Sequence, residues 1–426
     1  MKRLFILSAA VAALASCSNS EVITEVNEPQ VLDKAIAFET FSSNATRDAA
    51  ENSGQTKTDG LEEHHNNFQV WGYKDVQTTY VFDRVTVSYT EGQTGSWNYS
   101  PIHFWDKNAN SYEFYACAPA TSSFTLNRQE TISATQANDY FTLSDVTLQN
   151  VTSSKTEYVQ SLKDNQVSNS VNESSETTST SLTYGDAQAN TDYMIANACK
   201  VANNDFGKPV QLHFNHILSR LNITVKKGTT LNNAKLDVVS LQVFNMVSKG
   251  SFDESKADNS NGGTTLSSGT TARWTPSDEA GDKVTYVANA LSDVKSDYTT
   301  DIDNYILQSL VIPQTIEYEE IKLDGSTSSP LQPYMKIVYK ITTGTGNDTN
   351  TETYTAYYNL AAAFGATEPS NTAEGRYNKV AFNEGWQNTL NITIDAAQIT
   401  FTPDVYQWQD TDPSGSIEIG KITQNP

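Results

Sequence analysis

Two apolar patterns of different phase meet in the stretch Pro209-Val-Gln-Leu-His-Phe-Asn-His-Ile-Leu-Ser-Arg-Leu-Asn-Ile-Thr-Val-Lys-Lys227. The first pattern occupies even-numbered positions and the second occupies odd ones: Val210, Leu212, Phe214 and Leu218, then Leu221, Ile223 and Val225. Because successive side chains of a strand point to opposite faces, a shift of one residue reverses the buried face unless a bulge intervenes. The stretch therefore predicts a strand that leaves one core and enters another, with a domain boundary near His216.

The rest of the chain has the composition of a β protein. Tyr (21) and Phe (16) are abundant, and Ser, Asn, Gly and Asp interrupt the apolar runs at short intervals. Such short runs are typical of strands joined by turns, and long amphipathic helical patterns are absent from the sequence. Residues 151–182 are rich in Ser, Thr, Asn and Gln, which indicates a long insertion within the first domain. Both halves are predicted to be all-β.

The N-terminus has the features of a secretory signal. Lys2 and Arg3 precede an apolar run over residues 4–16, which is too short to cross a bilayer, and Cys17 follows Leu14-Ala-Ser16. This arrangement resembles a bacterial lipobox, in which the cysteine is acylated and becomes the mature N-terminus. We expect residues 1–16 to be removed and Cys17 to hold the protein on a membrane through lipid. The alternative is an ordinary signal peptide with an incidental cysteine.

Several classes of function have little support. Fifty acidic against 28 basic side chains give a formal charge of −22, which opposes binding to nucleic acid. The five histidines lack zinc-binding spacing, so no metal or cofactor is predicted, and Cys117 and Cys199 are too few for a disulfide framework. The sequence contains no nucleophile elbow, phosphate-binding loop or dinucleotide fingerprint. We therefore expect no enzymatic activity.

One further strand is predicted near the N-terminus. In Ala35-Ile-Ala-Phe38 and the residues that follow, Ile36, Phe38 and Thr40 share one face, as in a strand that adds to a sheet. Arg47, followed by Asp48, lies in the polar segment directly after it. An exposed arginine in a polar loop is a site where a trypsin-like protease cuts, although it also occurs in loops that are never processed.

These features in their order resemble the fimbrillins of Bacteroidetes, the Mfa-like and FimA-like subunits of type V pili. The resemblance covers nearly the whole chain and rests on the following motifs: the lipobox at Cys17, Ile36-Ala-Phe38, Ala45-Thr-Arg47, Phe68-Gln-Val-Trp-Gly72, Trp97-Asn-Tyr-Ser-Pro101, Phe104-Trp105, Tyr112-Glu-Phe-Tyr-Ala-Cys-Ala-Pro119, Asp192-Tyr-Met-Ile-Ala196, Val210-Gln-Leu-His-Phe-Asn-His-Ile-Leu218, Leu310-Val-Ile-Pro-Gln314, Gly385-Trp386 and Trp408.

The resemblance implies two tandem transthyretin-like β-sandwich domains, over residues 61–216 and 217–426, after a tether and N-terminal strand over residues 17–60. It also implies a structural pilus subunit, located at the cell outer membrane as a lipoprotein or in a fimbrium, that supports adhesion. Its implied partners are other fimbrial subunits, a trypsin-like protease that cuts after Arg47, and a host or bacterial surface ligand. Assembly is implied to proceed by donor-strand exchange once the N-terminal strand has been removed.

The C-terminal tail is a candidate donor strand. Ile417 and Ile419 alternate with polar residues in Ser416-Ile-Glu-Ile-Gly-Lys-Ile422, and Gly420 interrupts the pattern before Ile422. The same pattern is typical of a last edge strand of the C-terminal domain. Two alternatives to a polymerising subunit stay open: an uncut anchor that keeps its lipid, and a glycan-binding lipoprotein that uses Trp71, Trp97 and Trp105 as stacking platforms.

Overall fold

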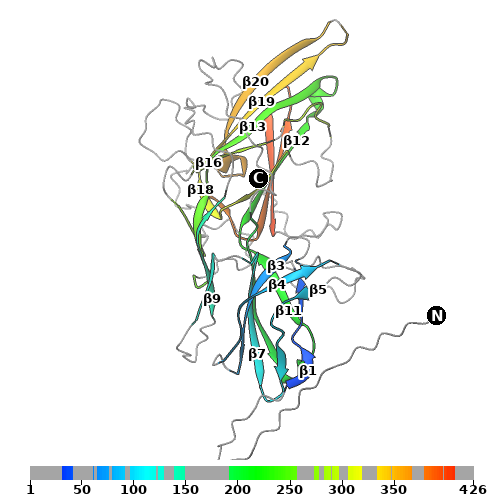
Figure 1. The fold of residues 1–426 in the computed structure, drawn as a ribbon. Coiled ribbons are helices and arrows are strands. Elements are labelled where there is room, and N and C mark those ends of the chain that lie inside the picture. Colours follow the sequence, from blue (N-terminus) through cyan, green and yellow to red (C-terminus); the bar gives the residue numbers. More distant parts are fainter. Residues whose placement is uncertain are drawn as a thin grey trace, which may run out of the picture.

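The computed structural model places the chain as two groups of strands that follow one another along its long axis (Figure 1). It describes residues 31–41, 61, 65–75, 79–91, 96–120, 123–128, 139–148, 191–256, 273–277, 283–288, 290–296, 306–318, 333–346, 348–366, 379–396 and 398–407. Within these ranges the fold is almost entirely strand, and the only α-helix is the single turn α1 (Leu360–Ala363). The predicted all-β sandwich class is confirmed.

The first group is built on a seven-stranded sheet in the order β2-β11-β10-β7-β3-β4-β5. Its strands are β2 (Phe38–Phe41), β3 (Asn67–Lys74), β4 (Thr79–Thr90), β5 (Ser96–Asn98), β7 (Ser111–Ala118), β10 (Met194–Ala202) and β11 (Val210–His216). Neighbours are antiparallel except β2 and β11, which run parallel. The edge strand β2 and its partner β11 lie far apart in the sequence.

Both faces of this sheet are buried. One face carries Phe68, Phe114 and Phe214 into a core closed by the N-terminal segment and by residues 97–109. The other face carries Trp71 and Tyr115 into a second core. The two cysteines also divide between the cores, Cys117 in the second and Cys199 at the margin of the first, so they lie on opposite faces and form no disulfide. Burial raises the pKa of both thiols.

The second core is covered by a sheet that joins the two halves of the sequence. Its order is β15-β14-β9-β8, with bounds β8 (Phe124–Asn127), β9 (Tyr140–Thr147), β14 (Lys249–Asp253) and β15 (Trp274–Pro276). The antiparallel pairing of β9 with β14 crosses the boundary expected near His216. The Trp274 indole nitrogen also donates a hydrogen bond of 2.6 Å to the carbonyl oxygen of Ile217. The division at residues 216 and 217 stays a prediction, and backbone pairing links the strands on its two sides.

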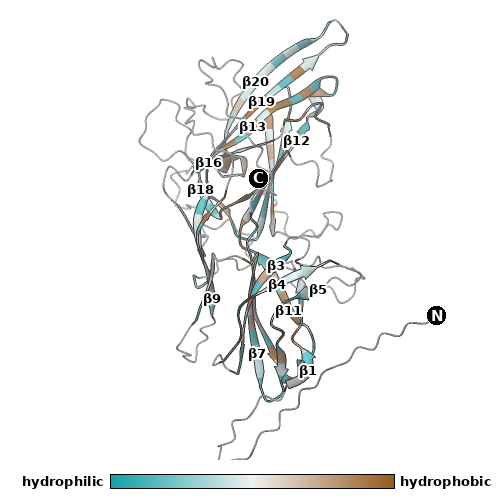
Figure 2. Cartoon of the chain, in the orientation of Figure 1, coloured by the Kyte–Doolittle hydropathy of each residue, from teal (hydrophilic) through white to brown (hydrophobic). Residues whose placement is uncertain are grey.

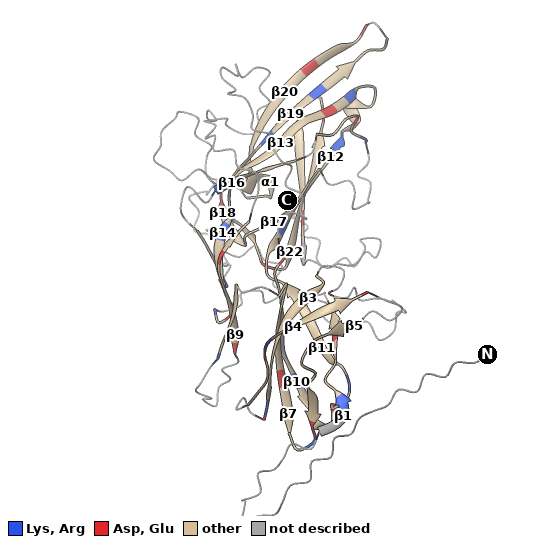
Figure 3. Ribbon diagram, in the orientation of Figure 1, with Lys and Arg blue, Asp and Glu red and all other residues tan. Residues whose placement is uncertain are grey.

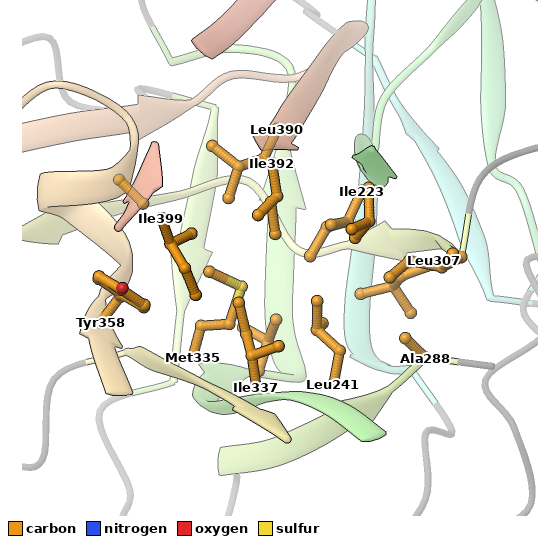
Figure 4. Packing of buried hydrophobic residues seen from close by; sticks show 14 of the residues in the cluster. Ile223, Leu241, Ala288, Leu307, Met335, Ile337, Tyr358, Leu390, Ile392 and Ile399 are labelled. Carbon is orange, nitrogen blue, oxygen red and sulfur yellow. The ribbon is translucent and has the colours of Figure 1, made fainter. Parts of the chain in front are cut away.

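The second group is a sandwich of two four-stranded sheets, β17-β12-β22-β23 and β16-β13-β19-β20, with a short pair β18-β21 beside it. The strands are β12 (Ser219–Lys227), β13 (Lys235–Val247), β16 (Lys283–Val287), β17 (Leu307–Val311), β18 (Gln314–Glu317), β19 (Tyr334–Thr343), β20 (Asn350–Asn359), β21 (Lys379–Phe382), β22 (Trp386–Ile394) and β23 (Ile399–Gln407). Side chains from both sheets meet in one core, including Ile223 and Ile392 from one and Leu241 and Ile337 from the other (Figure 4).

The stretch predicted to be one strand that passes between two cores is two strands in different sheets. β11 ends at His216 and β12 begins at Ser219, so the change of apolar phase falls between them. Leu212 on β11 is buried in the core of the seven-stranded sheet, whereas Leu221 on β12 is buried in the core of the C-terminal sandwich. Apolar and polar residues alternate along β13 and other strands, as a sheet with one buried face requires (Figure 2). Acidic and basic residues are interspersed over the described strands (Figure 3).

Candidate functional site

The N-terminal segment, residues 31–41, lies across the first core and is the candidate site. Its first strand, β1 (Val31–Ala35), pairs antiparallel with β6 (Phe104–Asp106), and its second strand, β2, pairs parallel with β11 at the edge of the seven-stranded sheet (Figure 1). Ile36, Phe38 and Thr40 are buried, whereas Ala37 and Glu39 are exposed. The predicted inward face is therefore confirmed. The predicted single strand is interrupted, because β1 ends at Ala35 and β2 begins at Phe38, so that Ile36 and Ala37 lie between two strands.

Hydrogen bonds to its backbone hold the centre of this segment on two sides. The Ile36 amide donates to the His103 carbonyl oxygen at 2.8 Å, and the Tyr99 hydroxyl donates to the Ile36 carbonyl oxygen at 2.7 Å. One residue later, the Val210 amide donates to the carbonyl oxygen of Ala37 at 2.7 Å. Since Tyr99 directly follows β5, at the far edge of the sheet, and Val210 begins β11, the segment contacts residues from both ends of the sheet.

The side chain of Phe38 enters a site made of four aromatic rings, which we call the Phe38 site. The ring centroids of Phe68, Phe82, Tyr99 and Phe114 lie 5.8, 5.5, 5.7 and 5.9 Å from that of Phe38, all in edge-to-face geometry. Such aromatic pairs contribute about 0.5–1.5 kcal/mol each beyond the burial of their area. The Phe38 site thus holds β2 more strongly than a generic apolar contact would.

A glycine permits this ring cluster. A Cβ atom at Gly72 on β3 would lie 2.9 Å from side-chain atoms of both Phe82 and Phe114, a distance that packed carbon atoms do not tolerate. Any larger residue at position 72 would displace the rings that surround Phe38. The small residue at this position therefore helps to fix the shape of the Phe38 site.

The end of the segment contacts a leucine that lies C-terminal to Arg47 in the sequence. The Thr40 hydroxyl oxygen accepts a hydrogen bond of 3.3 Å from the Leu61 amide, and Leu61 is fully buried in the first core. Phe41 stacks on His213 of β11 with ring centroids 4.7 Å apart. Residues 31–41 and Leu61 therefore anchor both ends of the connection that contains Arg47.

An ion pair supports β6, the partner of β1. Lys74 Nζ lies 2.7 Å from Asp106 Oδ2, and the Asp106 amide donates to the Tyr112 hydroxyl oxygen at 2.8 Å. Burial alone would raise the pKa of Asp106, but hydrogen bonds from Lys74 and Asn108 and the lysine charge lower it overall. The hydrogen bond to Asp106 raises the pKa of Lys74.

The pKa shift of Asp106 predicts a pH-dependent contribution to stability. A carboxylate whose pKa is lowered by folding stabilises the protein above its unfolded pKa of about 3.9 and loses that effect as the pH falls through the folded value. We expect Lys74→Met to lower the free energy of unfolding by about 1–2 kcal/mol at pH 7. Denaturant titrations should show this difference shrink on acidification, whereas Lys107→Met, at an exposed neighbouring lysine, should change little at either pH. A difference that does not depend on pH would contradict the role of the ion pair.

The residues predicted from the sequence to be processed, lipidated or donated lie outside the described residues: Cys17, Arg47, Asp48, Ile417, Ile419 and Ile422. The same holds for the insertion over residues 151–182. Sequence reasoning missed Tyr99, Phe82 and Leu61 as parts of the site. Tyr99 alternates with Trp97 and could have been read as facing inward, whereas Leu61 is a single apolar residue in a polar stretch and carried no pattern.

The three tryptophans considered as sugar platforms are used for packing. Trp71 is 6% exposed and Trp105 is 0% exposed. Trp97 packs against Phe68 and Tyr89, with ring centroids 4.9 and 5.2 Å away. Stacking on a sugar requires an open ring face, so Trp71 and Trp105 do not present a glycan-binding surface in this structure.

The part of the chain that the structure describes contains neither a metal-binding group nor a membrane-spanning helix. Within it, no three metal-ligating side chains gather in a group that could hold an ion. None of its helices has the length and apolar character needed to cross a membrane.

The comparison with known protein families matches the chain over residues 167–408 to the family described as fimbrillin-like. The match covers more than half of the sequence. The chain belongs to the fimbrillin-like family. This membership supports a structural role in a cell-surface fimbrium or in adhesion rather than an enzymatic role.

Solved structures similar to this fimbrillin-like chain include two from Bacteroides species. A fimbrial protein from Bacteroides vulgatus is 14% identical with a TM-score of 0.42, and the match covers 88% of this chain and 100% of that one. A proposed cell adhesion protein from Bacteroides uniformis is 15% identical with a TM-score of 0.39, and the match covers 89% and 100% of the two chains. No curated protein matches the chain. Membership therefore rests on the match over residues 167–408.

Proposed function

We propose that this chain is a structural subunit of a type V pilus, exported as an outer-membrane lipoprotein and assembled by donor-strand exchange after its N-terminal segment has been removed. The observation that supports this function is the way in which residues 31–41 lie in the fold. They complete the edge of one sheet through β2 and pair with β6 through β1, yet only one connection joins them to the rest of the described chain.

Removal of the segment would leave an unpaired strand edge and an exposed apolar surface, and another strand could cover both. The edge of β11 would lose its backbone partner, and the Phe38 site and the positions of Ile36 and Thr40 would be open to water. Unpaired edge groups and an apolar surface together favour the addition of a strand. A strand from a neighbouring subunit would satisfy both at once and would join the two subunits.

The connection between Phe41 and Leu61 suits a proteolytic switch. Arg47 lies within it, so a cut after Arg47 separates β1 and β2 from all the other described strands. While the connection is intact, the tethered segment competes with any incoming strand at an effective concentration on the order of millimolar. After the cut this advantage disappears, and the segment can be displaced. The partners that this function requires are a trypsin-like protease, which cuts the connection, and other fimbrial subunits, which supply the incoming strand.

N-terminal sequencing of the protein from the cell surface tests this function, together with electrophoresis of samples that have not been boiled and samples that have. We expect an N-terminus at Asp48 and a ladder of species that resists boiling in detergent. A mature N-terminus that stays at Cys17, without a ladder, would contradict the exchange function and would favour the uncut anchor.

Lipid attachment at Cys17 predicts a loss of membrane association in Cys17→Ala. Acyl chains hold a protein at a membrane because each buried methylene group contributes about 0.8 kcal/mol. We expect the variant to lose metabolic lipid labelling and to leave the membrane fraction, whereas Ser18→Ala, next to the attachment site, should keep both. Unchanged labelling of Cys17→Ala would show that the lipobox prediction is wrong.

A further inference from the structure

The position of Phe38 is shaped for an aromatic side chain rather than for any apolar one. All four rings of the Phe38 site meet Phe38 at interplanar angles between 64° and 89°. An aliphatic side chain has no ring edge or face, so it would forfeit these contacts and leave unfilled volume between rings.

The position of Thr40 requires a small side chain. Thr40 is 6% exposed, and its hydroxyl oxygen accepts the hydrogen bond from the Leu61 amide. Leu61 lies on the C-terminal side of Arg47, so it stays with the protein after a cut there. A long or charged side chain at the position of Thr40 would displace Leu61 or bury a charge, and both are costly.

From these two positions we propose that the site selects its incoming strand by an aromatic residue, and that the strand comes from a different subunit rather than from a second copy of this chain. The donor carries a bulky aliphatic residue at the position of Ile36, an aromatic residue two positions later and a small hydroxyl residue two positions after that. This inference rests on the proposed donor-strand exchange.

The tail of a second copy fits this pattern poorly when it runs in the direction of β2. With Ile417 at the position of Ile36 and Ile419 at that of Phe38, Lys421 falls at the buried position of Thr40. A shift of two residues avoids the buried charge. This shifted alignment places Ile419 at the position of Thr40 and Gly415 at the position of Ile36. Because the Ile36 side chain is 1% exposed, a glycine at its position would leave a cavity.

The last described strand before the tail is already paired. Trp408, which follows that strand in the sequence, fits the pattern poorly, because with Trp408 at the position of Phe38 the charged residue Asp410 falls at the buried position of Thr40. Strand β23 ends at Gln407 and pairs along its length with β22 in the C-terminal sandwich. Releasing it would expose the core on which Ile399 and Phe401 pack. The tail beyond residue 413 contains no aromatic residue.

Peptide exchange into the full-length protein tests the selection. A recognition site for a specific protease, inserted after Arg47, allows the connection to be cut while residues 31–41 stay bound. Fluorescently labelled peptides are then added, and their uptake is measured by anisotropy. The peptides are residues 31–41, the same peptide with Phe38→Ala, Phe38→Ile or Glu39→Ala, and residues 414–426.

We expect the peptide of residues 31–41 and its Glu39→Ala form to exchange equally well, because Glu39 is exposed. Phe38→Ala should bind roughly a hundredfold more weakly or worse, and Phe38→Ile and the tail peptide about tenfold more weakly or worse. If the Phe38→Ile peptide or the tail peptide binds as tightly as residues 31–41, aromatic selection is wrong while exchange itself stands. If even the unchanged peptide fails to enter the cut protein, the proposed exchange function is wrong and the selection falls with it.

Discussion

Replacing Phe38 with alanine should lower the free energy of unfolding of the uncut protein by about 3–5 kcal/mol, the range found when a buried phenylalanine is truncated. The side chain is 6% exposed and contacts four rings, so its removal loses both burial and edge-to-face contacts. Urea denaturation followed by tryptophan fluorescence measures the change.

The matched control is Glu39→Ala on the exposed face of the same strand. It should change the free energy of unfolding by no more than about 0.5 kcal/mol, because exposed substitutions away from special contacts have small effects. Equal stabilities for Phe38→Ala and the unchanged protein would mean that the N-terminal segment does not contribute to the fold, and the case for a displaced strand would lose its structural basis.

Arg47→Ala should abolish fibre formation and leave an intact precursor, because β1 and β2 would stay tethered over the position that an incoming strand needs. The readouts are the mass of the surface protein and the detergent-resistant ladder. Lys57→Ala is the matched control, since Lys57 lies in the same connection between Phe41 and Leu61 and is the next basic residue after Arg47. We expect this control to be processed and to assemble normally.

Deletion of residues 414–426 separates donor from acceptor. If the tail donates, the shortened chain should be processed to a stable monomer that cannot donate a strand, whereas Arg47→Ala cannot accept one. A deletion that unfolds the protein would show that the tail is an internal strand of the C-terminal sandwich. Normal polymerisation of Arg47→Ala would show that the processing switch is wrong.

Local alternation was enough to locate many strands and their buried faces. The runs around Phe68, Tyr112 and Val210 form β3, β7 and β11, and the run that begins at Leu390 pairs antiparallel with the run that begins at Ile399. Short apolar runs of this kind need only a period of two and a turn, which neighbouring residues determine. The inward face of the N-terminal strand was visible for the same reason.

The pairings that build the candidate site were not visible in the sequence. The partner of β2 is β11, far along the chain, and the Ile36 carbonyl oxygen receives its hydrogen bond from Tyr99. The pairing of β9 with β14 across the expected domain boundary is equally remote. A period of two says which face of a strand is buried but not which strand lies beside it, because the choice depends on how all the sheets pack together.

The sequence by itself therefore determined the strand class, the change of apolar phase between β11 and β12 and the buried face of residues 36–40. Only the tertiary structure decided that this face meets four aromatic rings from separate parts of the chain and that Leu61 closes the end of the segment. The physical reason is that alternation is a property of neighbouring residues along one strand. A binding position for a strand, in contrast, is formed by backbone edges and side chains that meet only after distant parts of the chain have folded together.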